Sequence, residues 1–324
     1  MAQKAPDYSV DPHLSPAVKA FLKPLNAGGP APESLSEQDA RNVLIDLQAS
    51  VKVDLSGIDE SEKTITQDGY TVKLNIVRPK GKKEKLPVFI FTHGGGWVLG
   101  DYPTHKRLVR DLVVASDCAA VFVNYTLSPE AHYPQAINEI YAAAKWVSEH
   151  GDEININGKN MAAAGNSAGG NMTAALCMKA KHKGGPVIKL QILMWPATDT
   201  SFTEDSYEQY GQQRFLTIPL MKWSWDRYTM DAAQRKEKYA SPLQASLEEL
   251  KDLPPALIQV AENDILRDEG EAYGRKLEQA GVKVLSVRYN GMIHDFGMLN
   301  GLAETAQVKG LIELAAAELK KYLQ

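Results

Sequence analysis

The sequence of 324 residues predicts an α/β protein in which a mostly parallel sheet is flanked by helices. The main observation is an alternation, from residue 88 onward, of short, continuously apolar segments with longer amphipathic ones. Strands that are apolar on both faces are typical of parallel sheets, because helices cover both sides of such sheets. The composition agrees, since 44% of the residues are hydrophobic and 23% are charged, as in an ordinary globular domain.

Residues 1–55 are predicted to form helices that lie outside the sheet. Ser15 is suited to cap a helix over 16–25, and the glycines and proline at 28–30 separate it from a second helix that opens at Ser36. The second helix places four apolar residues on one face: Ala40, Val43, Leu44 and Leu47. Because such a face must rest on another part of the protein, we expect these helices to form part of a lid.

The sheet is predicted to begin with an antiparallel hairpin. Residues 64–66 and 70–77 alternate in polarity around Gln67-Asp68-Gly69, which is a good turn sequence. Further strands are predicted at 88–91, 119–124, 161–164, 190–194, 256–260 and 284–289, with helices at 106–115, 134–149 and from about 303. These segments supply the expected parallel sheet and the helices that cover it.

An insertion of different character separates two of these strands. Residues 199–231 are rich in aromatic side chains, and Thr217-Ile218-Pro219 is typical of the start of a helix. The stretch is too long for a simple crossover, so we interpret it as a helical cap that joins the amino-terminal helices over the site. The core domain is then made of residues 56–198 and 232–324.

The segment from Gly165 to Gly170 joins an apolar strand to a helix and contains the sequence Gly-Asn-Ser-Ala-Gly-Gly. Glycines on both sides of a serine permit a tight turn that exposes the hydroxyl at the positive end of the helix. Ser167 is therefore the candidate nucleophile. The alternative is a serine in an ordinary turn between a strand and a helix.

A serine hydroxyl needs a general base, and the base needs an acid that orients it. His294 follows the last predicted strand directly, and Asp264 follows the strand that ends at residue 260. The order Ser167, Asp264, His294 is that of the catalytic triad of an α/β hydrolase. For Asp264 the alternative role is a helix cap, and Asp268 and Glu269 are interpreted as acids of the first helical turn.

A glycine-rich stretch, His93-Gly94-Gly95-Gly96-Trp97, follows another predicted strand. Backbone amides in such a stretch can point into a site because no side chains cover them. We assign the amides of Gly95, Gly96 and Ala168 to an oxyanion hole, which would stabilise the negative charge formed by attack on a carbonyl. Taken without Ser167, the same stretch could cradle a phosphate.

Together these motifs resemble those of the hormone-sensitive-lipase-like carboxylesterases. That family has a His-Gly-Gly-Gly loop, a Gly-Asp-Ser-Ala-Gly-Gly turn, an Asp-x-Leu-x-Asp-Glu-Gly stretch and a late histidine. The segment 125–130, Tyr-Thr-Leu-Ser-Pro-Glu, is similar to the family's Tyr-Arg-Leu-Ala-Pro-Glu. The resemblance covers residues from about 60 to the end and implies an α/β-hydrolase fold.

The sequence departs from the family pattern at four positions. Asn166 replaces the aspartate beside the nucleophile, Asn124 and Thr126 replace an aspartate and an arginine, and Ile265 replaces a proline. Asn166 keeps the size and hydrogen-bonding capacity of aspartate but not its charge. We therefore expect activity to be retained, and the sequence leaves open whether the lost charge changes the dependence on pH.

The resemblance implies a serine carboxylesterase that hydrolyses short-chain acyl esters through an acyl-enzyme intermediate. Four aromatic residues are the predicted walls of the substrate pocket, namely Trp97, Phe215, Trp223 and Trp225. An acyltransferase that uses the same acyl-enzyme is an alternative. A ligand-binding protein without activity is another, because the fold alone does not set function.

The composition bears on partners, cofactors and location. The net charge of -4 and the scattered lysines give no support to nucleic-acid binding. Cys118 and Cys177 are expected to be buried free thiols, and neither a metal ion nor another cofactor is expected. The amino-terminal residues lack the apolar core of a signal peptide and no segment is long enough to span a bilayer, so we expect a cytoplasmic protein without membrane contact. The sequence leaves the oligomeric state open, with a homodimer among the states it allows.

Overall fold

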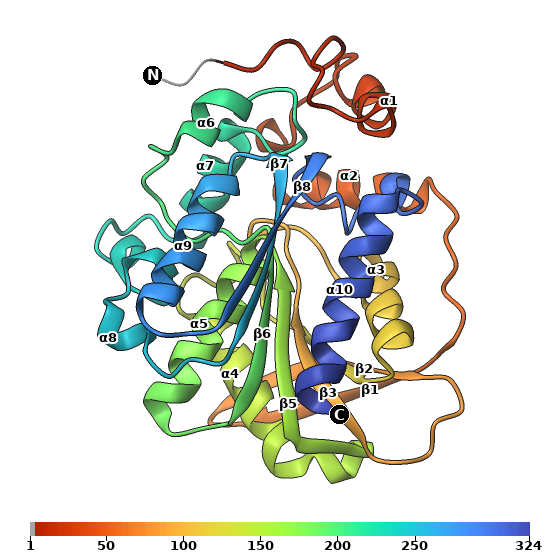
Figure 1. Ribbon diagram of the computed structural model, residues 1–324, viewed down its shortest axis with the longest axis vertical. Coiled ribbons are helices and arrows are strands. Elements are labelled where there is room, and N and C mark those ends of the chain that lie inside the picture. Colours follow the sequence, from red (N-terminus) through yellow and green to blue (C-terminus); the bar gives the residue numbers. More distant parts are fainter. Residues whose placement is uncertain (1–3) are drawn as a thin grey trace.

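The computed structural model describes residues 4–324 and contains one sheet of eight strands in the order β1-β2-β4-β3-β5-β6-β7-β8 (Figure 1). Strand β2 pairs antiparallel with both of its neighbours, and all pairs from β4 to β8 are parallel. The strands are β1 (Ile58–Gln67), β2 (Tyr70–Pro79), β3 (Leu86–Thr92), β4 (Ala119–Asn124), β5 (Ile156–Asn166), β6 (Ile188–Met194), β7 (Ala256–Asn263) and β8 (Val284–Ile293). The predicted mostly parallel α/β fold is confirmed.

Helices cover both faces of this sheet. One apolar core lies between the sheet and α4, α5 and α9, and a second lies between the sheet and α3 and α10 (Figure 1). The main helices are α3 (Tyr102–Ser116), α4 (Gln135–His150), α5 (Ala168–Lys183), α9 (Arg267–Gln279) and α10 (Ala306–Leu323), and a short α8 (Leu247–Leu250) precedes β7. Continuously apolar strands are explained by this arrangement, because both of their faces are buried.

The remaining helices gather beyond the carboxyl ends of the parallel strands. They are α1 (Pro16–Leu25), α2 (Glu37–Ala49), α6 (Asp205–Tyr210) and α7 (Ile218–Tyr228). The hydroxyls of Ser15, Ser36 and Thr217 accept hydrogen bonds from amides in the first turns of α1, α2 and α7, as the sequence predicts. Of the predicted amino-terminal region, residues 1–3 lie outside the described chain.

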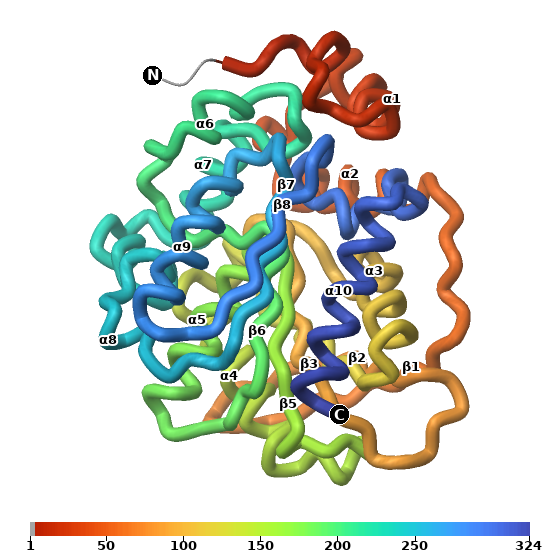
Figure 2. Tube along the Cα trace, viewed as in Figure 1, coloured from red at the N-terminus to blue at the C-terminus, as the bar shows by residue number. Residues whose placement is uncertain are grey.

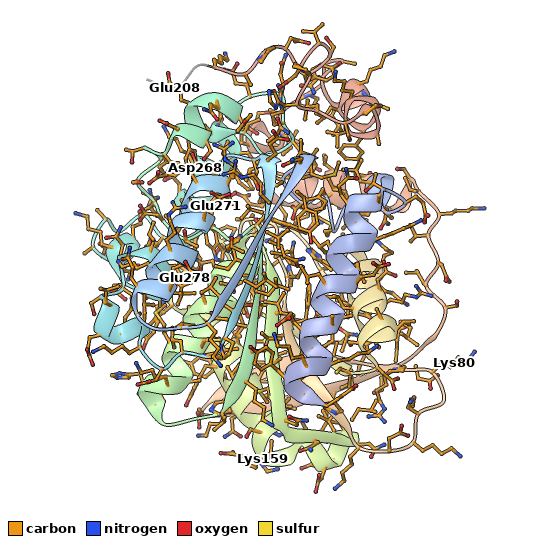
Figure 3. The ribbon with its side chains drawn as sticks, in the orientation of Figure 1. Lys80, Lys159, Glu208, Asp268, Glu271 and Glu278 are labelled. Carbon is orange, nitrogen blue, oxygen red and sulfur yellow. The ribbon has the colours of Figure 1, made fainter. Side chains whose placement is uncertain are left out.

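Many charged side chains are in contact with solvent, among them Lys80, Lys159, Glu208 and Glu278, which Figure 3 labels. All four are exposed. Within the described part of the chain, no helix combines the length and the apolar character needed to cross a membrane.

The amino-terminal segment is attached to the insertion that carries α6 and α7. Figure 2 shows this segment running beside the insertion. The amide of Ala5 donates to the carbonyl of Gln209 at 3.1 Å. Arg214 donates to Asp11 at 2.7 Å, and the two side chains are only 2% and 1% exposed. A buried ion pair therefore joins two segments about 200 residues apart in the sequence.

We predict that Arg214→Met destabilises the protein by about 3–5 kcal/mol, because it leaves the carboxylate of Asp11 buried without its partner. Urea denaturation of wild type and variant measures this loss. The matched control is Lys309→Met, which breaks an ion pair whose side chains are 58% and 92% exposed, and which should cost less than about 1 kcal/mol. Equal losses for the two variants would contradict the prediction.

Candidate active site

Ser167 occupies the sharp turn between β5 and α5. Its φ of 54° and ψ of -123° are uncommon for a residue other than glycine and hold the hydroxyl clear of the backbone. A Cβ atom at Gly165 would lie 2.4 Å from the carbonyl oxygen of Gly169, and one at Gly169 would lie 2.0 Å from that of Thr92. Only glycine fits at these two positions, so close packing explains the motif around the serine.

The structure brings Ser167, His294 and Asp264 together in one hydrogen-bonded chain. The Oγ of Ser167 lies 2.9 Å from the Nε2 of His294, and the Nδ1 of His294 lies 2.7 Å from the Oδ2 of Asp264. All three side chains are buried and follow the carboxyl ends of β5, β8 and β7. The second oxygen of Asp264 accepts from the amide of Leu266 at 3.0 Å, so this carboxylate also caps the turn before α9.

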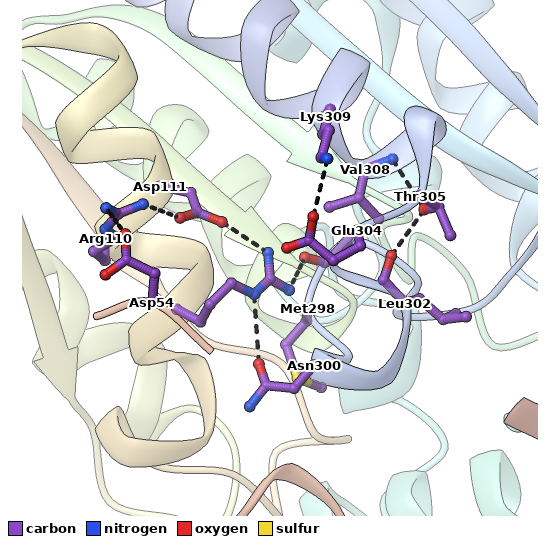
Figure 4. A network of polar contacts seen from close by, with 12 residues as sticks. Asp54, Arg110, Asp111, Met298, Asn300, Leu302, Glu304, Thr305, Val308 and Lys309 are labelled. Atoms are coloured by element: carbon purple, nitrogen blue, oxygen red, sulfur yellow. Dashed lines mark hydrogen bonds and ion pairs between the residues drawn. The ribbon is translucent and has the colours of Figure 1, made fainter. Parts of the chain in front are cut away.

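The loop that follows His294 is attached to α3 by a buried arginine. Arg107 donates to the carbonyl of Gly297 at 2.6 Å and to the carboxylate of Asp111 at 3.1 Å. Asp111 also pairs with Arg110 at 2.9 Å, and Figure 4 shows this pair on the opposite side of the network from residues of the loop. Helix α3 therefore fixes the position of the loop that carries the histidine.

Helix α2 contacts the same loop through Gln48. The side-chain amide of Gln48 donates to the carbonyl of Met298 at 3.0 Å, and its oxygen accepts from the amide of Asn300 at 2.9 Å. The side chain also donates to the carbonyl of Thr104 in α3 at 2.6 Å. Helix α2, which lies outside the sheet, thus forms hydrogen bonds with the loop that follows His294.

The glycine-rich stretch at 93–97 lies against the turn that carries the serine. Gly94 donates its amide to the Oδ1 of Asn166 at 3.0 Å, and the hydroxyl of Tyr125 donates to the carbonyl of His93 at 3.0 Å. Among residues 4–324, the amides of Gly95, Gly96 and Ala168 have no hydrogen-bond acceptor. Free amides beside Ser167 are the arrangement that an oxyanion hole requires.

His294 is buried among carboxylates. Burial by itself lowers the pKa of a histidine, but the charges of Asp264 and Asp295 and the hydrogen bond to Asp264 outweigh it and raise the pKa of His294 above its usual value. His294 therefore keeps a proton to a higher pH than an ordinary histidine. The neutral form, which can accept a proton from Ser167, is lost as the pH falls through this raised pKa.

Two further histidines lie behind the site. Burial lowers the pKa of His93 to about 4. Burial also lowers the pKa of His105 well below its usual value, and the charge of His93 adds to this effect. Both rings are therefore neutral at neutral pH.

Sequence reasoning did not single out Asp295. Its Oδ1 accepts hydrogen bonds from the Nε1 of Trp195 at 2.7 Å and from the side-chain amide of Asn166 at 3.0 Å. Its position next to His294 was the available signal, but neighbouring residues in a loop often point in different directions. Only the structure shows that this carboxylate faces the site.

A cavity of about 520 Å³ opens at Ser167 and His294. Gly95, Gly96 and Asp295 also line it, as do apolar side chains from α2 and the insertion. The apolar side chains from α2 and the insertion include Val43, Leu44, Leu47, Phe215, Leu216 and Met221. The amphipathic face predicted for the second helix thus borders the cavity.

Three of the four predicted pocket-wall aromatics require correction. Phe215 lines the cavity, but Trp97, Trp223 and Trp225 lie in the packed interior. Trp97 contacts Trp225 and stacks on Tyr228 at centroid distances of 4.4 and 4.3 Å. The aromatic clustering of the sequence reflects packing between the insertion and the rest of the protein, because large rings also stabilise such contacts.

Neither cysteine takes part in the site. Cys118 and Cys177 are buried and free, and burial raises the pKa of the Cys118 thiol to about 11. Across residues 4–324, no group of histidine, cysteine, aspartate and glutamate side chains is arranged to hold a metal ion.

A comparison with protein families matches residues 89–298 to the family described as alpha/beta hydrolase fold. This span contains the glycine-rich stretch and all three residues of the hydrogen-bonded chain. The protein belongs to the hormone-sensitive-lipase-like α/β hydrolases. The resemblance seen in the motifs is therefore confirmed.

Several relatives of this α/β hydrolase are named esterases or ester hydrolases. The carboxylic ester hydrolase LipN of Mycobacterium tuberculosis is 36% identical, over 82% of this chain and 72% of its own. An ethyl acetate hydrolase of Pseudomonas putida is 29% identical, over 94% and 98%. A thermostable esterase of Pseudomonas putida has a crystal structure with 57% identity and a TM-score of 0.96, covering 97% of this chain and 99% of that one. This α/β hydrolase is accordingly a carboxylic ester hydrolase.

We predict that Asp264→Asn lowers the pKa of His294 by at least about one unit, because removal of a contacting negative charge leaves burial as the stronger effect. An NMR titration of the histidine rings measures this pKa. The control is Asp252→Asn at an exposed position with a φ of 54°, which asparagine readily adopts. A titration of His294 that is the same in both variants would contradict the electrostatic assignment.

Proposed function

We propose that this esterase hydrolyses short-chain acyl esters of small alcohols through an acyl-enzyme on Ser167. The observation that carries the proposal is the continuous hydrogen-bonded chain from Ser167 through His294 to Asp264. Ser167 and His294 line the cavity. A serine becomes nucleophilic when a positioned histidine can remove its proton. This chain supplies that base and a carboxylate that orients it.

In the first half of the reaction, the Oγ of Ser167 attacks the ester carbonyl while the Nε2 of His294 takes its proton. The hydrogen bond from Nδ1 to Asp264 keeps the ring in the required orientation. The proton on Nε2 then passes to the alcohol oxygen as the carbon–oxygen bond breaks. In the second half, His294 activates a water molecule that releases the acid and restores the serine.

Stabilisation of the oxyanion is assigned to the amides of Gly95, Gly96 and Ala168. Gly95 and Gly96 adopt positive φ values of 106° and 60°, which turn their backbone away from the usual strand geometry. These amides lack protein acceptors among the described residues, so no internal hydrogen bond must break when the charge develops. Donors that are already oriented are the most effective kind.

The cavity supports a preference for small acyl groups. Its volume of about 520 Å³ lies toward the lower part of the range for small-molecule sites. Apolar side chains such as Leu44, Phe215 and Leu216 line it and suit an alkyl chain. The name of the relative from Pseudomonas putida, an ethyl acetate hydrolase, also points to a two-carbon acyl group.

We predict that Ser167→Ala lowers kcat/KM for nitrophenyl acetate by roughly 10⁴-fold or more, because the nucleophile is removed. Assays with nitrophenyl esters of increasing acyl length test activity and size preference, and wild type should favour acetate and butyrate over longer chains. Ser61→Ala, at an exposed position of β1, should retain wild-type rates. Persisting turnover in Ser167→Ala would refute the proposed mechanism, and a preference for long chains would refute the proposed substrate class.

We predict that Gly95→Ala lowers kcat by about 10²-fold or more, which is the effect of losing an oxyanion donor. A Cβ atom there would lie 2.3 Å from the carbonyl oxygen of Leu99, and the φ of 106° is unfavourable for alanine, so the stretch must move. Steady-state kinetics measure the effect, and circular dichroism checks the fold. The control is Gly310→Ala in α10, where a Cβ meets nothing within 4 Å and kcat should be unchanged. Full activity in Gly95→Ala would contradict the assignment.

A further inference from the structure

His294 lies between two carboxylates. Asp264 contacts its Nδ1 at 2.7 Å, and the Oδ2 of Asp295 lies 3.8 Å from its Nε2, which is the atom that faces Ser167. The side chain of Asp295 is 7% exposed. The catalytic chain uses only the first of these carboxylates, so the second needs an explanation.

Asp295 is held firmly in this place. Its Oδ1 accepts from Trp195 and from Asn166, and its backbone has a φ of 60°, in the left-handed region that aspartate adopts more readily than most other residues. Its Oδ2 has no hydrogen-bond donor among residues 4–324, and no lysine or arginine in that range forms an ion pair with Asp295. A buried carboxylate without a cation is unfavourable. Among the described residues, protonated His294 is the cation that forms an ion pair with Asp295.

We propose that Asp295 is a positioning residue that stabilises the protonated state of His294 during turnover, and that Asn166 is the neutral partner that permits a carboxylate at position 295. The inference rests on the proposed function, because above its pKa His294 gains a proton while the acyl-enzyme forms and breaks down. Asp295 takes no proton itself. The proton moves from Ser167 to Nε2 and then to the leaving alcohol, and Asp295 acts through charge alone.

The contacts of Asn166 explain why aspartate is absent there. Its Oδ1 accepts from the amide of Gly94, and its Nδ2 donates to Asp295 at 3.0 Å and lies 3.4 Å from the Nε2 of His105. An aspartate would keep the first contact, but it would place a second carboxylate at hydrogen-bond distance from Asp295. Two carboxylates at that distance cannot both stay ionised without penalty. Asn166 therefore bridges the oxyanion stretch and the additional carboxylate.

The other groups facing this cluster leave the charge of Asp295 effective. Asp264 follows β7, and Glu269 lies on α9, where burial raises the pKa of its carboxyl to about 8. His105, on α3, reaches the cluster through Asn166, and burial lowers its pKa far enough to keep it neutral. Within the described part of the chain, the surroundings thus contain carboxyl groups and a neutral imidazole, and no lysine or arginine pairs with Asp295 to cancel its charge.

The deciding experiment is the pH dependence of kcat/KM and kcat for Asp295→Asn. Asparagine keeps an oxygen that can accept from Trp195 and Asn166, so the change removes mainly charge. We expect the acid limb to move to lower pH by about one unit and the rate on the plateau to fall about tenfold, since protonated His294 loses a stabilising charge. Glu278→Gln, which removes an exposed charge on α9, should leave both quantities unchanged.

The charge-swap variant Asn166→Asp/Asp295→Asn tests the partnership. In this variant the side-chain amide of residue 295 can donate to the carboxylate at 166, and the amide of Gly94 keeps its acceptor, whereas Trp195 loses the oxygen that it shares with residue 166. We expect Asn166→Asp alone to lose more than tenfold in kcat/KM, and the double variant to recover most of that loss. If the loss of kcat/KM in the double variant equals the product of the losses in the two single variants, the pairing of Asn166 with Asp295 is overturned.

Two outcomes would overturn the role of Asp295. One is a wild-type acid limb and rate in Asp295→Asn. The other is a reduced rate with an unshifted limb, which would mark a merely structural contact. If Asp295→Asn does not fold, NMR titration of His294 in Asp295→Ser, which also removes the charge, replaces the kinetic limb, and an unchanged titration overturns the role. Turnover that persists in Ser167→Ala would instead refute the proposed function, so the two failures are distinguishable.

Discussion

The site depends on close backbone contact between two glycine-containing turns at the carboxyl ends of β3 and β5. Gly169 lies so near the carbonyl of Thr92 that a Cβ atom would approach it to 2.0 Å. This contact places free amides from one turn beside the serine of the other. The parallel order of β3, β5, β6, β7 and β8 then brings Asp264 and His294 to the same edge. Sheet topology and steric contact together determine the distances on which the chemistry depends.

Electrostatics adds a second constraint. A histidine buried without charged neighbours loses its affinity for protons, as His93 and His105 illustrate. His294 is equally enclosed, yet carboxylates reverse the effect. The same fold therefore holds imidazoles with opposite behaviour a short distance apart. The pKa of His294 differs from that of His93 because Asp264 and Asp295, which follow β7 and β8, lie beside His294.

Much of the fold and the hydrogen-bonded chain could be predicted because the signals are local. The turn at Asp68-Gly69 requires positive φ at both residues, which the structure shows, and the serines before α1 and α2 cap their helices as expected. The triad motifs depend on residues that follow strands directly. The pocket walls were harder to predict. The sequence shows that Trp97 and Trp225 are aromatic, but it does not show whether they line a cavity or pack in the interior with Tyr228. The direction of the Asp295 side chain depends on contacts far apart in sequence, which no local pattern reports.

The contacts of Gln48 have a consequence for the design of altered specificity. Helix α2 presents Val43 and Leu47 to the cavity, whereas Gln48 joins the same helix to Met298 and Asn300 beyond His294. A shift of α2 as a rigid unit would strain the bonds that hold the loop after His294. Reshaping the entrance is therefore safest through side-chain volume at Val43 and Leu47, with the axis of the helix left in place. Gln48 thus connects a helix that borders the cavity to the loop that follows His294.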